Sequence, residues 1–289
     1  MQIVTDSGAA PCLPAEQLAD LGIHVVPLAV TLDGALYREG LDIEPGEFYT
    51  RLAASGQMPT TSQPSAGSFA ELYRQLAATD PEILSIHISS GLSGTIGAAQ
   101  AGAALVPEAR VTHVDTHTLS AAAGWQTEAA ARAVLAGWDL PRILALLQRI
   151  SDATDCIYTL KELRYLIHGG RISHMKGLLA SLLNIKPMIS VEKEHGTYVQ
   201  MGQARSFPNA VRGVVDLVSR KYAPGSALRV QVLHADNEEG ALELRKQLDE
   251  RFACDWLAEG RISLVLGAHT GPSMVGVAFA AVDALGELP

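Results

Sequence analysis

The sequence predicts an α/β protein of two α/β domains, the first with a parallel sheet in three layers and the second mixed α/β. Short runs rich in Ile, Val and Leu alternate with helical patterns through the first half, as expected for βαβ units. The 289 residues suit two domains of about 150 residues each, and 48% hydrophobic content is ample for their cores. The pattern changes around residues 152–160, so we expect domains at residues 1–155 and 156–289.

The elements of the first half follow from this alternation. Apolar runs predict strands at residues 3–4, 24–30, 83–88 and 111–114, and the segments between them predict helices at residues 14–21, 44–54, 69–77 and 95–105. Ser68 followed by Glu71 has the spacing of a capping box, which predicts a helix start at Ser68. Ala and Gly dominate residues 94–104, so the helix there can lie close to its sheet.

Two further helices, at residues 119–136 and from Asp139 onward, lead into the second half. There the patterns predict strands at residues 185–191, 197–201 and 228–233, and helices at residues 211–222 and 238–251. Residues 262–282 contain no Asp, Glu, Lys or Arg and are long enough to cross a bilayer. Because a polar stretch around His269 interrupts them, we interpret them as a strand, a turn and a second apolar element.

The composition excludes several classes of function. Asp and Glu number 31 against 22 Lys and Arg, and the net charge of −9 disfavours binding to nucleic acid and anionic lipid surfaces. Cys12, Cys156 and Cys254 are too scattered for a disulfide framework or a clustered metal site. The chain opens without a basic or apolar targeting segment. We therefore expect a cytoplasmic protein that binds no nucleic acid and does not insert stably into membranes.

Four segments dense in hydroxyl groups follow predicted strands, at residues 5–8, 60–65, 89–95 and 115–118. In α/β sheets, ligands bind beyond the carboxyl ends of the strands, and hydroxyls beside backbone N–H groups at helix starts suit an anion. Any one of these segments is more often a helix cap than a binding site. Four of them at successive strand ends favour an anion-binding site.

Known catalytic motifs do not fit the chain. It contains no phosphate-binding loop of the form G-x-x-x-x-G-K-[ST] and no dinucleotide motif G-x-G-x-x-G. Residues 91–95 resemble a nucleophile elbow, but Thr95 stands where that motif needs Gly. His113 and His117 lack further ligands nearby and are interpreted as ordinary histidines at a strand end. We therefore predict no catalytic residue, no metal and no cofactor.

Two features of the second half carry functional hypotheses. His269, bracketed by Gly267 and Gly271 in an apolar region, is either structural or faces a ligand. A basic segment follows residue 160, and it is either a solvated helix face or a docking patch for an acidic partner or a phosphate. Its cations are Lys161, Arg164, Arg171 and Lys176, opposed by Glu162. Residues 177–185, nearly all apolar, are either a core helix or the wall of an acyl-chain site.

Taken in order, these segments resemble the DegV family, the bacterial fatty-acid-binding proteins that serve fatty acid kinase as FakB-type subunits. The resemblance spans nearly the whole chain, and its motifs are specific as a set although none suffices alone. They lie at residues 6–7, 61–65, 89–95, 115–116, 166–173, 186–187, 202–205 and 267–272. Ser273 departs from the Gly that is usual in the family after Gly-Pro, and a later Asp that many members carry after the Asp6–Ser7 motif is absent.

The resemblance implies that a long-chain fatty acid lies in an apolar tunnel with its carboxylate between the two domains. Thr61 and Ser93 match the residues that hydrogen-bond this carboxylate, and Arg205 and His269 match a second layer that acts through water. Ser62 and Gly94 follow them in the chain, so we expect their backbone N–H groups to supplement the hydroxyls. A buried carboxylate needs such donors or a countercharge, because otherwise it takes up a proton.

In the family, a separate ATP-dependent kinase phosphorylates the presented carboxylate to an acyl-phosphate that feeds phospholipid synthesis. The resemblance thus implies a substrate-presenting subunit and not an enzyme. We expect Arg171, with Arg164 and Lys176 around it, to help dock the kinase. Two alternatives stay open. One is a small-molecule kinase or phosphotransferase related to dihydroxyacetone kinases, whose fold is similar, and the other is a lipid carrier or sensor without a kinase partner.

Overall fold

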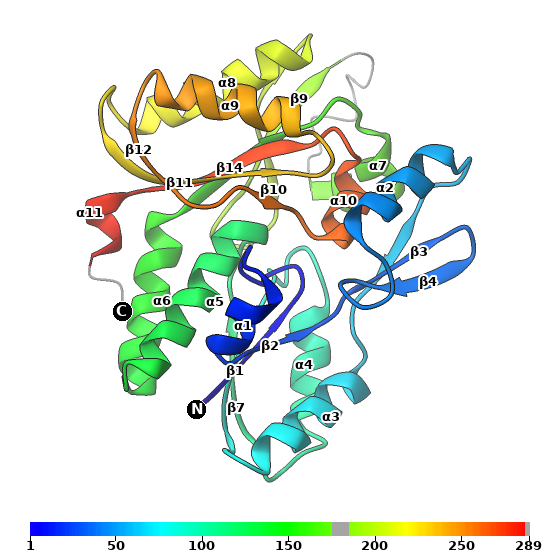
Figure 1. The fold of residues 1–289 in the computed structure, drawn as a ribbon, viewed down its shortest axis with the longest axis vertical. Coiled ribbons are helices and arrows are strands. Elements are labelled where there is room, and N and C mark those ends of the chain that lie inside the picture. Colours follow the sequence, from blue (N-terminus) through cyan, green and yellow to red (C-terminus); the bar gives the residue numbers. More distant parts are fainter. Residues whose placement is uncertain (175–184, 287–289) are drawn as a thin grey trace.

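The structure of the protein, a computed structural model, describes residues 1–174 and 185–286. It has a parallel sheet, a larger mixed sheet and a small antiparallel sheet, with helices packed around them (Figure 1). This architecture confirms the predicted α/β class. Within the two described ranges, no helix combines the length and the apolar character that a membrane span requires.

The first sheet is parallel throughout, with the strand order β2-β1-β6-β7. Its strands are β1 (Gln2–Asp6), β2 (Ile23–Val26), β6 (Glu82–His87) and β7 (Arg110–Asp115). Helices α3 (Ala66–Ala77) and α4 (Thr95–Ala103) cover one face, and α5 (Ser120–Leu135) covers the other. Side chains alternate between these faces, since Val4 packs with Phe69 of α3, whereas Ile3 belongs to the core shared with α5. The predicted three layers are therefore present.

The second sheet has the order β10-β9-β8-β14-β11-β12, and β13 also pairs with β11. Its strands are β8 (Asp155–Thr159), β9 (Lys186–Val191), β10 (Tyr198–Ala204), β11 (Ala227–His234), β12 (Ala253–Trp256), β13 (Gly260–Arg261) and β14 (Val275–Ala281). Helices α8 (Phe207–Lys221) and α9 (Glu238–Asp249) pack on one face through a Val- and Leu-rich cluster. Strands β12 and β13 run parallel to β11, whereas the pairs from β10 through β11 are antiparallel, so the sheet is mixed.

Helix α5 connects the two large sheets, because it contacts β1 and β6 of the first and β14 of the second. Helix α6 (Leu140–Ala153) packs beside α5, and the short α11 (Val282–Leu285) packs against α6. The largest apolar cluster accordingly contains residues from both halves of the chain, such as Ile86 and Ala278. The division into domains at residue 155 stays a prediction.

A third, antiparallel sheet positions the candidate site. Its order is β4-β3-β5, with β3 (Ala29–Leu32), β4 (Ala35–Arg38) and β5 (Thr60–Ser62). Helix α10 (Leu264–Thr270), from the other end of the chain, contacts β3, β5 and α7 (Arg164–His168) (Figure 1). This sheet was not predicted, because its strands are only three or four residues long, and residues 60–65 were expected to be a loop.

The predicted strand before His269 is wrong, because residues 264–270 form helix α10. All seven helix residues are buried, so their unbroken apolar pattern resembles that of a buried strand. The local signal that distinguishes the two is Ser263, whose hydroxyl accepts the Leu266 N–H at 3.2 Å as an N-cap.

Two other boundaries differ from the predictions. The strand expected at residues 24–30 is two strands in different sheets, since Pro27 has no N–H to donate and follows the end of β2. Helix α3 has Ser65 and not Ser68 as its N-cap, and the Ser65 hydroxyl accepts the Ser68 N–H at 3.0 Å. In contrast, Asp139 and Asn237 cap α6 and α9 as the sequence indicates.

Candidate functional site

Strand β5 and helix α10 bring together two of the predicted site residues. Thr61 Oγ1 lies 2.8 Å from Nε2 of His269. His269 is only 7% exposed, and its helix α10 contacts α7. Tyr165 and Leu166 of α7 and Leu266 of α10 belong to the largest buried apolar cluster. The pair therefore places a hydroxyl and an imidazole at the edge of an apolar interior.

The environment of His269 keeps its ring neutral near pH 7. Burial, followed by the positive charges of Arg171 and His168, lowers the pKa of His269 to about 4. Its Nδ1 is buried and has no hydrogen-bond partner among the described residues. Gly169 approaches this nitrogen so closely that a Cβ built on it would lie 2.0 Å from Nδ1. Gly169 therefore packs directly on the Nδ1 side of the ring, where a larger residue would displace the imidazole.

Arg171 provides the positive charge at this site. It begins the 3₁₀ turn Arg171–His174, is half-buried, and donates from Nη1 to the Gly169 carbonyl oxygen at 2.6 Å. Its charge also acts on His269, which neighbours Gly169. The residue predicted for partner docking thus lies beside the Thr61–His269 pair, a position that the sequence did not indicate.

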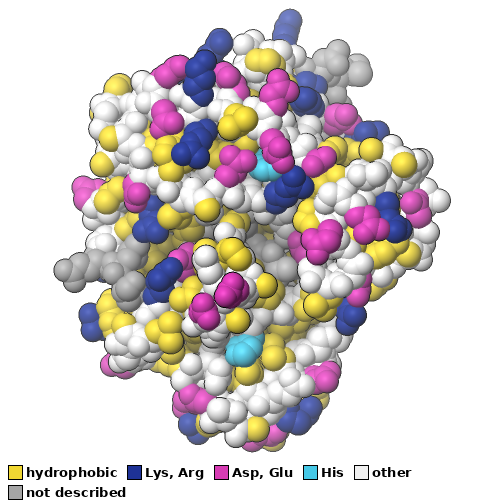
Figure 2. Space-filling view, in the orientation of Figure 1, with side chains coloured by type: hydrophobic (Ala, Val, Ile, Leu, Met, Phe, Trp, Pro, Cys, Tyr) yellow, Lys and Arg dark blue, Asp and Glu magenta, His cyan; other side chains and the backbone are white. Residues whose placement is uncertain are grey.

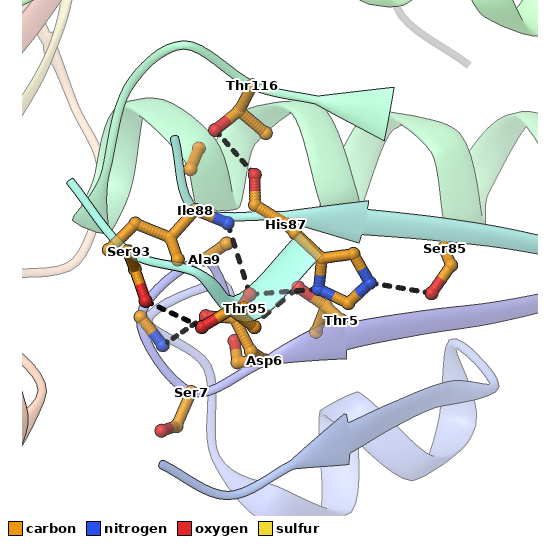
Figure 3. A network of polar contacts seen from close by, with 12 residues as sticks. Thr5, Asp6, Ser7, Ala9, Ser85, His87, Ile88, Ser93, Thr95 and Thr116 are labelled. Atoms are coloured by element: carbon orange, nitrogen blue, oxygen red, sulfur yellow. Dashed lines mark hydrogen bonds and ion pairs between the residues drawn. The ribbon is translucent and has the colours of Figure 1, made fainter. Parts of the chain in front are cut away.

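The Ser93 turn (residues 88–95) follows β6 and leads into α4. The hydroxyls of Ser93 and Thr95 lie 2.7 Å apart, and Thr95 is fully buried (Figure 3). A Cβ on Gly94 would lie 2.3 Å from Oε1 of Gln63, which directly follows β5. The turn therefore packs against the end of the strand that carries Thr61. The contacts of Gln63 with Gly94 and of Thr95 with Ser93 were not predicted from the sequence.

The remaining predicted residues lie farther out or outside the described ranges. Ser62 is exposed at the end of β5, and Arg205 is exposed at the bend between β10 and α8. Arg164 is 62% exposed, forms an ion pair with Glu162 and lies over the Tyr165 ring. Lys176 and most of the apolar residues 177–185 fall outside the described residues. The assignment of Ser62 and Arg205 to the carboxylate, and of Arg164 to docking, stays a prediction.

Ser273, the departure from the family pattern, has a structural role. Its hydroxyl accepts the backbone N–H of Lys161 at 2.9 Å. Asn237 donates to the Ser273 carbonyl oxygen at 2.8 Å. The Gly271 turn before it has a φ of +75°, which Gly adopts without strain. Ser273 thus ties the turn after α10 to the start of the basic segment.

A groove of about 640 Å³ is lined partly by α1 (Ala15–Asp20), and neither Thr61 nor His269 is among its lining residues. Figure 2 shows the hollow above α1 on this face of the molecule. Glu39 lines it, accepts from the Ser7 hydroxyl at 2.7 Å and also accepts from the N–H of Leu264, the first residue of α10. Burial raises the pKa of Glu39 to about 7. Glu39 therefore links the loop after β1 to the helix that carries His269.

Comparison with known proteins identifies the family. The sequence model that describes the DegV family (COG1307) matches residues 1–282 of this chain. A DegV domain-containing protein of Deinococcus radiodurans is 37% identical over 283 residues, which cover 98% of this chain and 99% of that protein. Protein DegV of Bacillus subtilis is 28% identical over 276 residues, which cover 95% of this chain and 97% of that protein.

Solved structures agree in fold. The chain is similar to a fatty-acid-binding DegV family protein from Thermus thermophilus, with a TM-score of 0.84 and 32% identity over 97% of this chain and 99% of that one. It is also similar to DegV, a fatty acid binding protein from Bacillus subtilis, with a TM-score of 0.86 and 27% identity over 97% and 98% of the two chains. On the extent of these matches, the chain belongs to the DegV family.

Proposed function

We propose that the protein binds a long-chain fatty acid and holds its carboxylate at Thr61, Ser93 and His269. The observation that carries the proposal is the buried, neutral His269, whose Nε2 lies 2.8 Å from the Thr61 hydroxyl and whose ring is acted on by the positive charge of Arg171. The fatty-acid binding of the Thermus thermophilus and Bacillus subtilis relatives supports it. The predicted N–H donors of Ser62 and Gly94, and Arg205 acting through water, complete the head-group site.

The proton positions follow from the hydrogen-bond partners of the ring. Thr61 Oγ1 lies 2.8 Å from Nε2, whereas Nδ1 has no acceptor among the described residues, so we assign the proton of neutral His269 to Nε2. Nε2–H then donates to Thr61 Oγ1, which leaves the Thr61 hydroxyl proton free to donate to the carboxylate. His269 thereby orients the Thr61 hydroxyl, and the charge of Arg171 favours the ionised carboxylate.

The tail supplies most of the binding free energy. Each methylene moved from water into an apolar site contributes about 0.8 kcal/mol, so a chain of about sixteen carbons is anchored firmly even if burial is incomplete. The head-group contacts contribute less and fix the orientation of the ligand. Variants of the head-group site should therefore weaken binding without abolishing it.

A variant of Ser93 tests the proposed head-group site. Replacing Ser93 with Ala removes one donor and should weaken the affinity for oleic acid by about 1–3 kcal/mol, measured by calorimetric titration of delipidated protein. Ser90→Ala is the matched control, because Ser90 is exposed in the same turn and uses its backbone N–H to bond Asp115. Equal affinities of the wild type and Ser93→Ala would exclude Ser93 from the site.

We further propose that the protein presents the carboxylate to an ATP-dependent fatty acid kinase in the cytoplasm and leaves the phosphoryl transfer to that partner. Support comes from the family resemblance and from a basic segment that begins beside the site. Arg164 is a sharper docking probe than Arg171, because it is exposed, whereas Arg171 contacts Gly169 next to His269. Charge reversal in Arg164→Glu should impair acyl-phosphate formation with the kinase while the oleic acid affinity is kept. Undiminished turnover would contradict this docking surface.

A further inference from the structure

Two carboxylates flank the Ser93 turn at the edge of the parallel sheet. Strand β6, which leads into the turn, lies between β1 and β7. Asp6 is the last residue of β1, and Asp115 is the last residue of β7. Since parallel strands end at the same edge, both carboxylates lie beside the point where the chain leaves β6.

Asp6 holds the first residue of the turn. It is fully buried, and its Oδ2 accepts the Ile88 N–H at 3.1 Å and Nδ1 of His87 at 3.0 Å (Figure 3). Its Oδ1 accepts the Gly8 N–H at 2.9 Å. Because a carboxylate only accepts hydrogen bonds, His87 Nδ1 has to carry a proton. One side chain thus joins the loop after β1 to the loop after β6.

Asp115 holds the turn two residues later. Its two oxygens lie 3.2 and 3.3 Å from the Ser90 N–H, and Oδ1 also accepts the His117 N–H at 3.0 Å. Between these anchors, the Ser89 carbonyl oxygen accepts the N–H groups of both Leu92 and Ser93 at 3.0 Å. The backbone position of Ser93 therefore depends on residues 88–90, which the two carboxylates fix from either side.

The polar chain behind Asp6 is not itself a catalytic site. Ser85, His87 and Asp6 are spaced like a nucleophile, a base and its orienting acid, with Ser85 Oγ 2.7 Å from His87 Nε2. All three are fully buried, and the Ser85 hydroxyl is also bonded to Tyr73 at 2.7 Å. A substrate cannot reach this serine, so the chain acts as a support for the His87 ring and, through it, for Asp6.

We infer that Asp6 and Asp115 are positioning residues for the fatty-acid head group, which act by holding Ser93 in its binding position and touch no ligand. The identity of the ligand rests on the proposed function. The claim that the two carboxylates hold the turn concerns the ligand-free protein and is tested without a ligand. In Asp6→Asn, one of the two accepting oxygens becomes an N–H₂ group, which cannot accept a hydrogen bond. The N–H groups of Gly8 and Ile88 bond different oxygens of Asp6, so at least one of them loses its partner. Asp115→Ala removes both acceptors of the Ser90 N–H at a site where the side chain is 20% exposed.

The experiment compares Asp6→Asn and Asp115→Ala with Tyr73→Phe, which removes a buried hydroxyl from the far end of the polar chain. Hydrogen exchange of delipidated protein reports the turn directly. Amides of residues 88–95 should exchange at least tenfold faster in both Asp variants and at the wild-type rate in Tyr73→Phe. Oleic acid Kd should rise about tenfold in each Asp variant, and combining either with Ser93→Ala should add little further loss, because they act through the same hydroxyl.

Wild-type exchange of residues 88–95 in both Asp variants would overturn the inference. So would an unchanged Kd, or losses that add fully to that of Ser93→Ala. If Asp6→Asn fails to fold, Asp115→Ala alone decides between these outcomes. A wild-type protein that binds no oleic acid would contradict the proposed function instead, and the exchange rates would still decide whether the two carboxylates hold the turn.

Discussion

Thr61 and His269 are 208 residues apart in the chain, yet their side chains meet at 2.8 Å between Oγ1 and Nε2. The contact joins the small antiparallel sheet, from the first quarter of the chain, to a helix near the C-terminal end. His269 is buried, with 7% of it exposed, whereas Thr61 is half-buried, so the pair lies between solvent and the interior. A polar pair in this setting fixes the direction in which each hydroxyl or ring nitrogen can act on a ligand.

The first prediction concerns the Thr61 hydroxyl. Thr61→Val keeps the β-branched shape but removes the hydroxyl, so it should weaken oleic acid binding by about 1–3 kcal/mol and leave His269 Nε2 without its partner. Titration calorimetry of delipidated protein measures the change. Thr60→Val is the matched control, because Thr60 is the adjacent residue of β5 and points to the opposite face. A Thr61→Val protein that binds as tightly as the control would place the carboxylate elsewhere.

A second prediction uses the space beside His269. Gly169→Ala introduces a Cβ that would lie 2.0 Å from Nδ1, so the ring has to move or the helix end has to shift. We expect a loss of about 1–3 kcal/mol in the free energy of unfolding and a weaker oleic acid affinity. Gly97→Ala, with nothing within 4 Å of its Cβ in helix α4, should leave the oleic acid affinity unchanged and raise the free energy of unfolding by about 0.5–1 kcal/mol. Equal melting and binding of the two variants would show that the ring does not depend on this contact.

The third prediction is a pH dependence of stability. The pKa of His269 is lowered from an ordinary 6.5 to about 4, so between these values the unfolded chain binds a proton that the folded protein does not. The free energy of unfolding therefore falls as pH drops through this window, by about 2–3 kcal/mol between pH 7 and pH 4.5. Urea unfolding at both pH values should show a smaller loss for His269→Gln than for the wild type. The same loss in both proteins would mean that His269 is not held neutral.

Glu39 gives a fourth prediction of opposite sign. Its pKa is raised from 4.5 to about 7, so the folded protein keeps a proton that the unfolded chain releases in this window. The contribution of Glu39 to stability is therefore lost as pH rises from about 4.5 to 7. Because Glu39 lines an open groove, we expect about 1–2 kcal/mol.

Replacing Glu39 with Gln should thus stabilise the protein at pH 8 and leave its stability near pH 4.5 almost unchanged. Gln still offers an oxygen to the N–H of Leu264 and a donor to Ser7. Glu44→Gln, on the rim of the same groove, controls for the loss of one negative charge. The prediction is wrong if Glu39→Gln is no more stable than Glu44→Gln at pH 8.

The sequence predicts the longer apolar strands of the two large sheets well, because strongly periodic helices separate them, but it misses β8, β12 and β13 of the second sheet. Strands β6 and β11, for example, are each within two residues of the predicted bounds. It fails at the third sheet, whose strands have three or four residues, and at α10, whose residues are apolar on every side. Both failures lie where the Thr61–His269 pair forms, so the elements that build the site carry the weakest local signals.

Contacts between residues that are far apart in the chain could not be predicted from the sequence either. The motifs singled out Thr61, Ser93 and His269, but nothing in their spacing indicates that Thr61 meets His269 or that Gln63 meets Gly94. Arg171 looked like a surface cation, because its neighbours in the chain are basic and polar. Only the approach of α7 to α10 shows that its charge acts on a buried imidazole.

The most direct test of the account is mass spectrometry of the purified protein, first in its native state and then after solvent extraction. The account predicts a mass increase of one fatty acid per chain, and the same fatty acid in the extract. Delipidated protein should take up added oleic acid to the same stoichiometry. A protein that carries no lipid, refuses added oleic acid and binds a nucleotide or a small carbonyl compound would contradict the account.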